Sequence, residues 1–309
     1  MTRSGILEKS AIYELFKDKD FGKILFDEPM KNHTSFKIGG PADVLIIPDN
    51  EESVMEAIKY CRENNVKYFI MGNGTNLLVK DTGIRGAVVK IANGYDKIDV
   101  TENRVFCQSG ALLKKVAEFC LENSLTGFEF ACGIPGTVGG AIAMNAGAYG
   151  GEMKDIVTKV RVLDRNNNIV ELSNEDMKFR YRGSSVIDEE LIVLGVEFKL
   201  EKGEYSAIEE KMKDLTNRRE TKQPLEYPSA GSTFKRPEGY FAGKLIDDAG
   251  LRGVRYGDAQ VSEKHCGFVI NAGNATFDEV ITLIKTIQKV VHDRFDVMLE
   301  TEVKIIGDD

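Results

Sequence analysis

Residues 131–153, ACGIPGTVGGAIAMNAGAYGGEM, form the stretch of this 309-residue chain with the clearest chemical use. The stretch holds seven glycines and five alanines, and it carries no charged residue before Glu152. Glycine reaches positive φ without strain, so such a loop can point successive backbone N–H groups at one anion or let a flat ligand lie against the chain. The stretch therefore predicts a loop around an anionic or flat cofactor. A tightly packed crossing of buried elements is the alternative.

A second glycine-rich segment, GNGTN at residues 72–76, follows a short apolar run at residues 68–71. Many α/β proteins present backbone amides to phosphate at a glycine-rich turn after a strand. However, the segment does not match GxGxxG, and residues 77–91 have a strand-like pattern where a Rossmann fold needs a helix. The sequence therefore disfavours a Rossmann dinucleotide fold. A simple hairpin turn is the alternative for GNGTN taken alone.

The cysteines and histidines do not form a metal-binding pattern. The five cysteines include no CxxC pair, and the three histidines (His33, His265 and His292) lie far apart in the sequence. Structural zinc sites combine clustered Cys and His ligands. We therefore expect no metal site and reduced thiols in a reducing compartment.

The composition is that of a globular protein with more than one core. Hydrophobic residues make up 42% of the chain, charged residues make up 29%, and the net charge is −8. An acidic chain is a poor nucleic-acid binder, and no apolar run approaches the ~20 residues that span a bilayer. The N-terminus lacks the apolar segment of a signal peptide. We expect a cytoplasmic monomer that binds neither nucleic acid nor membrane.

The periodicity of apolar residues predicts a mixed α/β chain. Residues 6–17, 51–64, 111–123, 207–220, 240–249 and 276–295 have helical spacing, and residues 136–146 favour a short helix. Strands are predicted at 44–47, 68–71, 191–200, 266–271 and 297–306, with hairpins at 97–109 and 156–172. Residues 221–239, rich in Pro, Gly and Ser, are predicted to form a long loop of the kind that often carries function. The expected domains are an N-terminal helical arm (1–32), a cofactor domain (33–200) and a second α/β domain (204–309).

Seven motifs in order resemble one enzyme family. TSFKIGGPAD, GNGTNLLV and GIPGTVGGAIAMNAGAYGGE resemble the flavin-binding signatures of the UDP-N-acetylenolpyruvoylglucosamine reductase family. YRGSS, SAGSTFKRP, VSEKHCGFVIN and LETEVKIIG resemble its downstream motifs, so the resemblance runs from about residue 31 to 307. It implies a two-subdomain FAD-binding domain of the vanillyl-alcohol-oxidase (PCMH) type, followed by a smaller substrate-binding α/β domain. The short connection from Arg182 to the strand at 191–200 resembles the compact subtype, which lacks an inserted tyrosine-bearing loop.

The resemblance also implies a reaction. NADPH would reduce noncovalently bound FAD, which would pass hydride to C3 of the enolpyruvyl ether of UDP-N-acetylglucosamine, with protonation at C2 giving UDP-N-acetylmuramate. Arg182 matches the family's catalytic arginine, Ser232 its proton donor and Glu302 its catalytic glutamate. An always-charged guanidinium suits the carboxylate and enolate-like charge of this reaction, whereas a serine is a weak acid that needs a relay partner.

The same resemblance assigns binding residues. The FAD-binding candidates are small or polar residues of the two glycine-rich segments: Gly72, Asn73, Gly74, Thr75, Asn76, Gly133, Gly136, Thr137, Gly139, Gly140, Ala146 and Gly147. The substrate-binding candidates are Lys222, Arg236 and His265, with Arg219 a weaker one. Lys304, two residues after Glu302, is expected on the same strand face and near a phosphate or a structural carboxylate.

Two other functions fit parts of the sequence. An FAD-dependent oxidase or dehydrogenase of the same fold would share the glycine-rich segments, but such enzymes often link flavin covalently through His or Cys. No histidine lies in either segment, which favours noncovalent FAD. A non-catalytic flavin-binding module would not need Arg182, Ser232 and Glu302 together.

Overall fold

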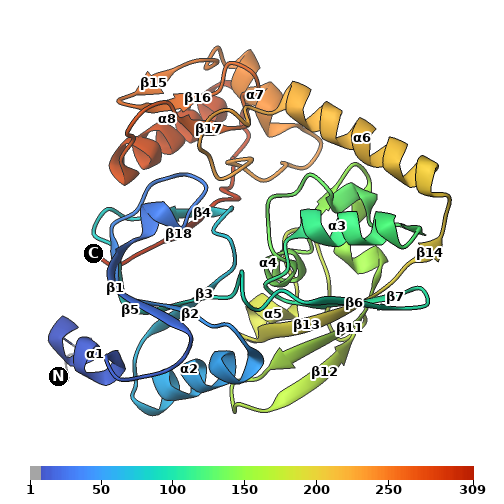
Figure 1. Cartoon of the computed structure of the whole chain (residues 1–309). Coiled ribbons are helices and arrows are strands. Elements are labelled where there is room, and N and C mark those ends of the chain that lie inside the picture. The colour runs from blue at the N-terminus through green and yellow to red at the C-terminus, as the bar shows by residue number, and fades with distance from the viewer. Residues whose placement is uncertain (1–7) are drawn as a thin grey trace. The chain divides into compact units, whose positions relative to one another are not determined.

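The computed structural model describes residues 8–309, which form two compact units (Figure 1). Unit 1 contains residues up to 25 together with 44–73 and 87–219, and unit 2 contains residues 26–43, 74–86 and 220–309. The chain passes from one unit to the other within β1 (Lys23–Pro29), β2 (Pro41–Ile47) and β5 (Ile84–Lys90). These strands and β3 (Tyr68–Met71) form a sheet of order β1-β2-β5-β3. Neither unit is therefore one continuous stretch of sequence, and the domain ranges 33–200 and 204–309 stay predictions.

Unit 1 is built on a five-stranded antiparallel sheet of order β12-β11-β13-β7-β6. Its strands are β6 (Ile98–Thr101), β7 (Arg104–Gln108), β11 (Val157–Leu163), β12 (Ile169–Ser173) and β13 (Ile192–Lys199). Helices α3 (Leu113–Glu122) and α4 (Val138–Ala143) cover one face of this sheet (Figure 1). Val160, Val196 and Phe198 of the sheet are buried in one core with Val116 of α3 and Ile142 of α4.

The remaining elements of unit 1 are mostly helices. They are α1 (Lys9–Phe16), α2 (Glu51–Glu63), the one-turn helix α5 (Ser185–Asp188) and the long α6 (Tyr205–Lys222), whose last residues belong to unit 2. Asn50 caps α2 as predicted, because its side chain accepts a hydrogen bond from the Ser53 N–H at 2.8 Å. Two pairs of short strands complete the unit: β8 (Leu125–Thr126) with β14 (Glu201–Lys202), and β9 (Gly147–Ala148) with β10 (Gly151–Glu152).

Unit 2 packs two helices, α7 (Ala242–Asp248) and α8 (Phe277–Phe295), in one core with the sheet β15-β16-β17. The strands of that sheet are β15 (Arg255–Tyr256), β16 (Ala259–Val261) and β17 (Val269–Asn271). Thr276 opens α8 with a capping box, and five apolar residues on one face of the helix are buried: Val280, Leu283, Ile284, Ile287 and Val291. A parallel pair, β4 (Leu77–Val79) with β18 (Lys304–Ile306), joins distant parts of the sequence.

Most predicted elements are present, and two predictions near the C-terminus are wrong. The strand expected at 297–306 is reduced to β18, which starts only at Lys304. Glu302 lies before this strand, so Glu302 and Lys304 do not share a strand face. The helix expected at 6–17 is observed as α1, and its first two residues lie outside the described residues.

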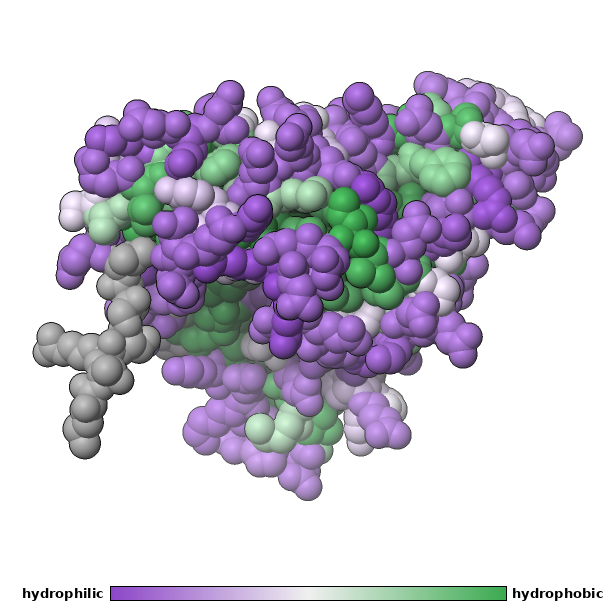
Figure 2. Space-filling model, turned by 90° about the horizontal axis from the view of Figure 1, so that it is seen from below, coloured by the Kyte–Doolittle hydropathy of each residue, from purple (hydrophilic) through white to green (hydrophobic). Residues whose placement is uncertain are grey.

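The surface and the cysteines agree with the composition. Hydrophilic side chains cover most of the face drawn in Figure 2. All five cysteines are buried and carry free thiols. Within residues 8–309, no helix is both long enough and apolar enough to cross a membrane.

Candidate functional site

A tight turn in unit 1 presents Arg182. The backbone groups of Arg180 and Gly183 bond to each other in both directions, at 3.0 and 3.2 Å, and close a turn with Tyr181 and Arg182 at its corners. Arg182 has φ 55°, a left-handed conformation that is unfavourable for a bulky residue. The structure therefore holds Arg182 in a conformation that the sequence alone would not choose, as often occurs at functional sites.

This turn is tied to residues 131–153, which we call the small-residue loop. The Ser184 hydroxyl donates to the Ala143 carbonyl at 3.0 Å, and the Asn145 amide donates to the Arg180 carbonyl at 3.3 Å. Asn145 is buried, and it also donates to Glu152 at 2.6 Å and accepts from the Lys154 N–H at 3.0 Å. The predicted catalytic arginine is thus fixed to the loop predicted to bind FAD.

The small-residue loop is close-packed against its own unit. Thr137 is buried and caps α4 by accepting from the Gly140 N–H at 3.5 Å. Gly72 approaches Thr137 so closely that a Cβ at position 72 would overlap the Thr137 hydroxyl. A Cβ at Gly139 would lie 3.0 Å from the Ser109 Cβ, whereas a Cβ at the exposed Gly140 would meet no heavy atom closer than 3.6 Å. Several of these glycines are therefore required by protein packing, and Gly140 is open to a ligand.

Polar groups beside this loop fit an anionic, oxygen-rich cofactor such as FAD. The Ser109 hydroxyl is buried, and it has no hydrogen-bond partner within residues 8–309. The Ser109 carbonyl accepts from the Gly139 N–H at 2.8 Å, which places this hydroxyl next to α4. A buried hydroxyl without a partner is unfavourable unless a ligand or water completes it. Gly72, Asn73, Gly133, Gly136, Thr137, Gly139, Gly140, Ala146 and Gly147 all belong to this unit.

The other predicted catalytic residues lie in unit 2, where Thr233 connects them. The Thr233 carbonyl accepts from the Glu302 N–H at 2.8 Å, and Thr233 directly follows Ser232. The Thr233 N–H donates to the Gly267 carbonyl at 2.8 Å, and its hydroxyl accepts from the Val269 N–H at 2.9 Å. Thr233 is buried, so these bonds fix the backbone of Ser232, Glu302 and the segment after His265 relative to one another.

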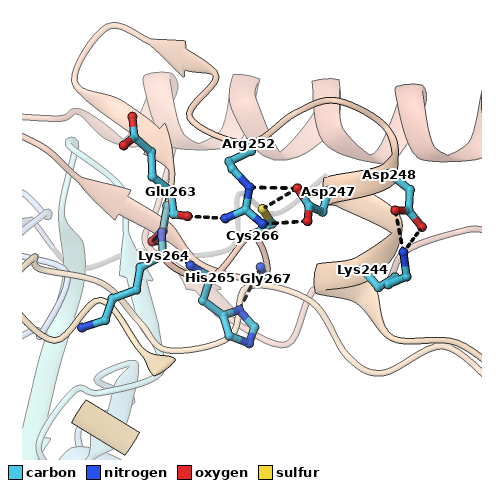
Figure 3. Close-up of polar contacts among 10 residues, drawn as sticks. Lys244, Asp247, Asp248, Arg252, Glu263, Lys264, His265, Cys266 and Gly267 are labelled. Atoms are coloured by element: carbon cyan, nitrogen blue, oxygen red, sulfur yellow. Dashed lines mark hydrogen bonds and ion pairs between the residues drawn. The ribbon is translucent and has the colours of Figure 1, made fainter. Parts of the chain in front are cut away.

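The protonation state of His265 follows from its contacts (Figure 3). The Gly267 N–H donates to Nδ1 of His265 at 3.1 Å, so the neutral ring carries its proton on Nε2. Nε2 has no protein partner within the described part of the chain, and the ring packs edge-on against Phe268. Burial lowers the pKa of His265, which its own backbone hydrogen bond partly opposes and the charge of Arg252 reinforces. His265 therefore presents an N–H donor at neutral pH.

The GNGTN segment divides between the two units. Gly72 and Asn73 belong to unit 1, and Gly74, Thr75 and Asn76 belong to unit 2. Gly74 has φ 64°, which favours glycine. The Asn76 side chain donates to the Glu302 carbonyl at 3.2 Å, and the Asn76 carbonyl accepts from the Lys304 N–H at 2.9 Å. The structure thus brings Asn76, predicted from a cofactor motif, beside Glu302.

Lys222 and Arg236 are both exposed, as substrate-binding cations would be. Lys222 ends α6, and the Arg236 guanidinium stacks over the Phe241 ring at 4.0 Å. Their assignment to substrate remains a prediction.

Three residues that organise these sites were missed by the sequence analysis. They are Ser109, Asn145 and Thr233, which are all polar and all buried. Only Asn145 had a local signal, because it lies inside the small-residue loop and asparagine tolerates its φ of 43°. The partners of Thr233 lie more than 30 residues away in the sequence, so no local pattern reveals its role.

Comparison with known proteins agrees with these observations. Residues 42–173 match the family described as FAD binding domain, and residues 223–306 match the family described as UDP-N-acetylenolpyruvoylglucosamine reductase, C-terminal domain. UDP-N-acetylenolpyruvoylglucosamine reductase from Clostridium perfringens is 56% identical over 96% of both chains, and that from Caldanaerobacter subterraneus is 58% identical over 93% of this chain and 95% of the relative. The crystal structure of the Thermus caldophilus reductase has a TM-score of 0.78 and 32% identity, and the match covers 92% of this chain and 98% of that one. The chain therefore belongs to the UDP-N-acetylenolpyruvoylglucosamine reductase family, with the FAD-binding domain and the C-terminal domain that define it.

Proposed function

We propose that this protein reduces the enolpyruvyl ether of UDP-N-acetylglucosamine to UDP-N-acetylmuramate, a precursor of peptidoglycan, with NADPH as the electron source. Bound FAD would supply the redox chemistry, accepting hydride from NADPH and delivering it to C3 of the enolpyruvyl group. The chain's own residues must bind the substrate, stabilise the charge that develops on it and protonate C2.

The carboxylate end of the substrate needs a fixed cation. Addition at C3 moves negative charge onto C2 and the adjacent carboxylate, and a preorganised cation stabilises that charge without rearranging. We assign this role to Arg182, which is held in its left-handed turn by Arg180 and Gly183. Glu302 would steady the enol form through its own proton or through a cation.

Protonation at C2 is assigned to Ser232. The observation that carries this proposal is the pair of backbone bonds through which Thr233 joins Ser232 to Glu302 and to the His265–Gly267 segment. A serine donates a proton only when its hydroxyl is held in a fixed and polar environment, and these bonds support such an environment. His265 would contact the nucleotide portion of the substrate, as would Lys222 and Arg236, which are both exposed.

Steady-state turnover with matched substrates tests the proposal. The FAD-loaded protein should oxidise NADPH when UDP-N-acetylglucosamine enolpyruvate is added, and mass spectrometry should find a product heavier by two hydrogens. UDP-N-acetylglucosamine, which lacks the enolpyruvyl group, should support no NADPH oxidation. Reduction of the flavin by an alcohol in place of NADPH, with oxygen as the electron acceptor, would instead indicate an oxidase of the same fold.

A further inference from the structure

Helix α6 packs its inner face on the small-residue loop of unit 1. The Cys132 thiol donates to the Met212 carbonyl at 3.7 Å and lies 3.6 Å from the Thr216 hydroxyl, so two successive turns of α6 contact the loop. The Lys211 ammonium pairs at 3.2 Å with Glu129, a buried carboxylate just before the loop. Arg219 lies one further turn along the same helix face.

Arg219 lies directly on the loop, and a glycine makes this possible. A Cβ at Gly133 would lie 2.9 Å from the Arg219 Cδ, closer than real Cβ atoms pack, so any other residue at 133 would displace the arginine. Gly133 had been predicted to leave room for FAD. Here the space beside it holds the stem of a charged side chain.

The Arg219 guanidinium has no anionic partner among the described residues. It is half-buried, and it makes no hydrogen bond or ion pair with any residue from 8 to 309. Burial lowers the pKa of Arg219. The electrostatic interactions that oppose this effect come from Tyr149 and Cys132, and none comes from a carboxylate. A guanidinium stays charged at all accessible pH, and a charge removed from water without a partner is strongly unfavourable. The neighbouring Arg218, by contrast, is exposed and pairs with Asp214 at 2.8 Å.

We propose that Arg219 completes the cofactor site by binding an anionic oxygen of FAD. The inference rests on FAD lying against the small-residue loop, which is part of the proposed function. FAD offers such oxygens in two places: on its pyrophosphate, and on the flavin ring, which becomes negatively charged when FAD is reduced. In either case the anion that pairs with Arg219 comes with the cofactor.

Three variants test this proposal: Arg219→Met, Arg219→Lys and, as the matched control, Arg218→Met. The affinity of the apoprotein for oxidised FAD would be measured by flavin fluorescence, and the two-electron midpoint potential by dye equilibration. If the partner is the pyrophosphate, Arg219→Met should weaken FAD binding by about tenfold or more, which corresponds to one hydrogen-bonded ion pair. If the partner is the flavin ring, a tenfold selective loss for reduced FAD should lower the potential by about 30 mV.

Arg219→Lys should recover most of either loss, and Arg218→Met should change neither quantity. The thermal unfolding temperature of the Arg219→Met apoprotein should be equal to or higher than that of the wild-type apoprotein, because an unpaired charge has been removed. Unchanged FAD affinity together with an unchanged potential would overturn the proposal, even if the KM for the enolpyruvyl substrate rose. The FAD affinity, the midpoint potential and the unfolding temperature are all measured without the enolpyruvyl substrate. A negative result here therefore leaves the proposed reaction intact, and failure of the proposed reaction does not change how these results are interpreted.

Discussion

At the scale of single residues, the predicted catalytic residues and His265 fall into two sets, one in each unit, and hydrogen bonds fix the residues within each set. Arg182 is held in unit 1 by a left-handed turn that is bonded to the small-residue loop. Ser232, His265 and Glu302 are connected in unit 2 through Thr233. These candidate side chains are thus positioned by hydrogen bonds of the backbone around them, which remain when the side chains themselves are substituted.

Replacing Ser232 by alanine should separate the two half-reactions. Ser232 is assigned to protonate C2 of the substrate, so reduction of the flavin by NADPH should keep its wild-type rate. Reoxidation by the enolpyruvyl substrate should slow by about 10²–10⁴-fold, the usual contribution of a general acid. Stopped-flow absorbance measures both steps, and Ser229→Ala, in the same loop, is the control. Equal slowing of both steps would contradict the assigned role.

His265 offers a test of which ring nitrogen acts. The Gly267 N–H occupies Nδ1, so the free donor is Nε2–H. A glutamine amide can replace Nε2 and an asparagine amide can replace Nδ1, which makes the two variants a matched pair. We expect His265→Gln to keep the substrate KM within a few-fold, and His265→Asn to raise it about tenfold through loss of one hydrogen bond. A higher substrate KM for His265→Gln than for His265→Asn would contradict the assignment of Nε2–H as the group that contacts the substrate.

At the scale of elements, helix α4 and the small-residue loop are the segments that we propose hold FAD. Thr137 caps α4, Gly72 packs against Thr137, and Gly139 packs against Ser109, so much of the loop's small-residue content is needed for protein packing. Gly140 differs, because its outward face is open. The sequence could not separate these two uses of glycine, since the difference depends on neighbours far away in the chain.

Gly140→Ala therefore tests whether the open space beside Gly140 is used by the cofactor. An added methyl group would lie no closer than 3.6 Å to any described heavy atom, and alanine favours a helix by about 1 kcal/mol over glycine. The apoprotein should be as stable as the wild type or more stable, while FAD affinity falls. Thermal unfolding without FAD and titration with FAD measure the two effects. Normal FAD binding by this variant would show that α4 does not face the cofactor.

At the scale of the whole molecule, periodic patterns in the sequence predicted single helices and strands well, but they carried no information on which distant segments pack together. The helix at 277–295 was predictable because its buried residues recur with helical spacing. The expected strand at 297–306 was wrong over most of its length, because Leu299 and Val303 are buried in the core without joining a ladder. The family and its FAD domain were identified from motifs, and the comparisons confirm both. No sequence pattern indicated that residues 26–43 and 74–86 belong to unit 2.

Because unit 2 is built from three separate segments of the chain, a fragment that contains only the last segment should not fold. A fragment of residues 204–309 lacks β4, the parallel partner of β18, and it lacks Phe36 and Leu78, which are fully buried in the core of unit 2. Deleting buried aromatic and leucine side chains costs about 2–5 kcal/mol each, comparable with the whole stability of a small domain. We expect this fragment to show no cooperative thermal transition by circular dichroism. A folded fragment with a sharp transition would support the continuous domain at 204–309 instead.

The assigned reaction is tested most directly by following the absorbance of the bound flavin under anaerobic conditions. The purified protein should be yellow, and one equivalent of NADPH should bleach the flavin absorbance. Anaerobic addition of UDP-N-acetylglucosamine enolpyruvate should then restore the absorbance in a single turnover, with formation of UDP-N-acetylmuramate. A reduced flavin that stays bleached in the presence of this substrate, and regains its colour only when oxygen is admitted, would contradict the proposed function.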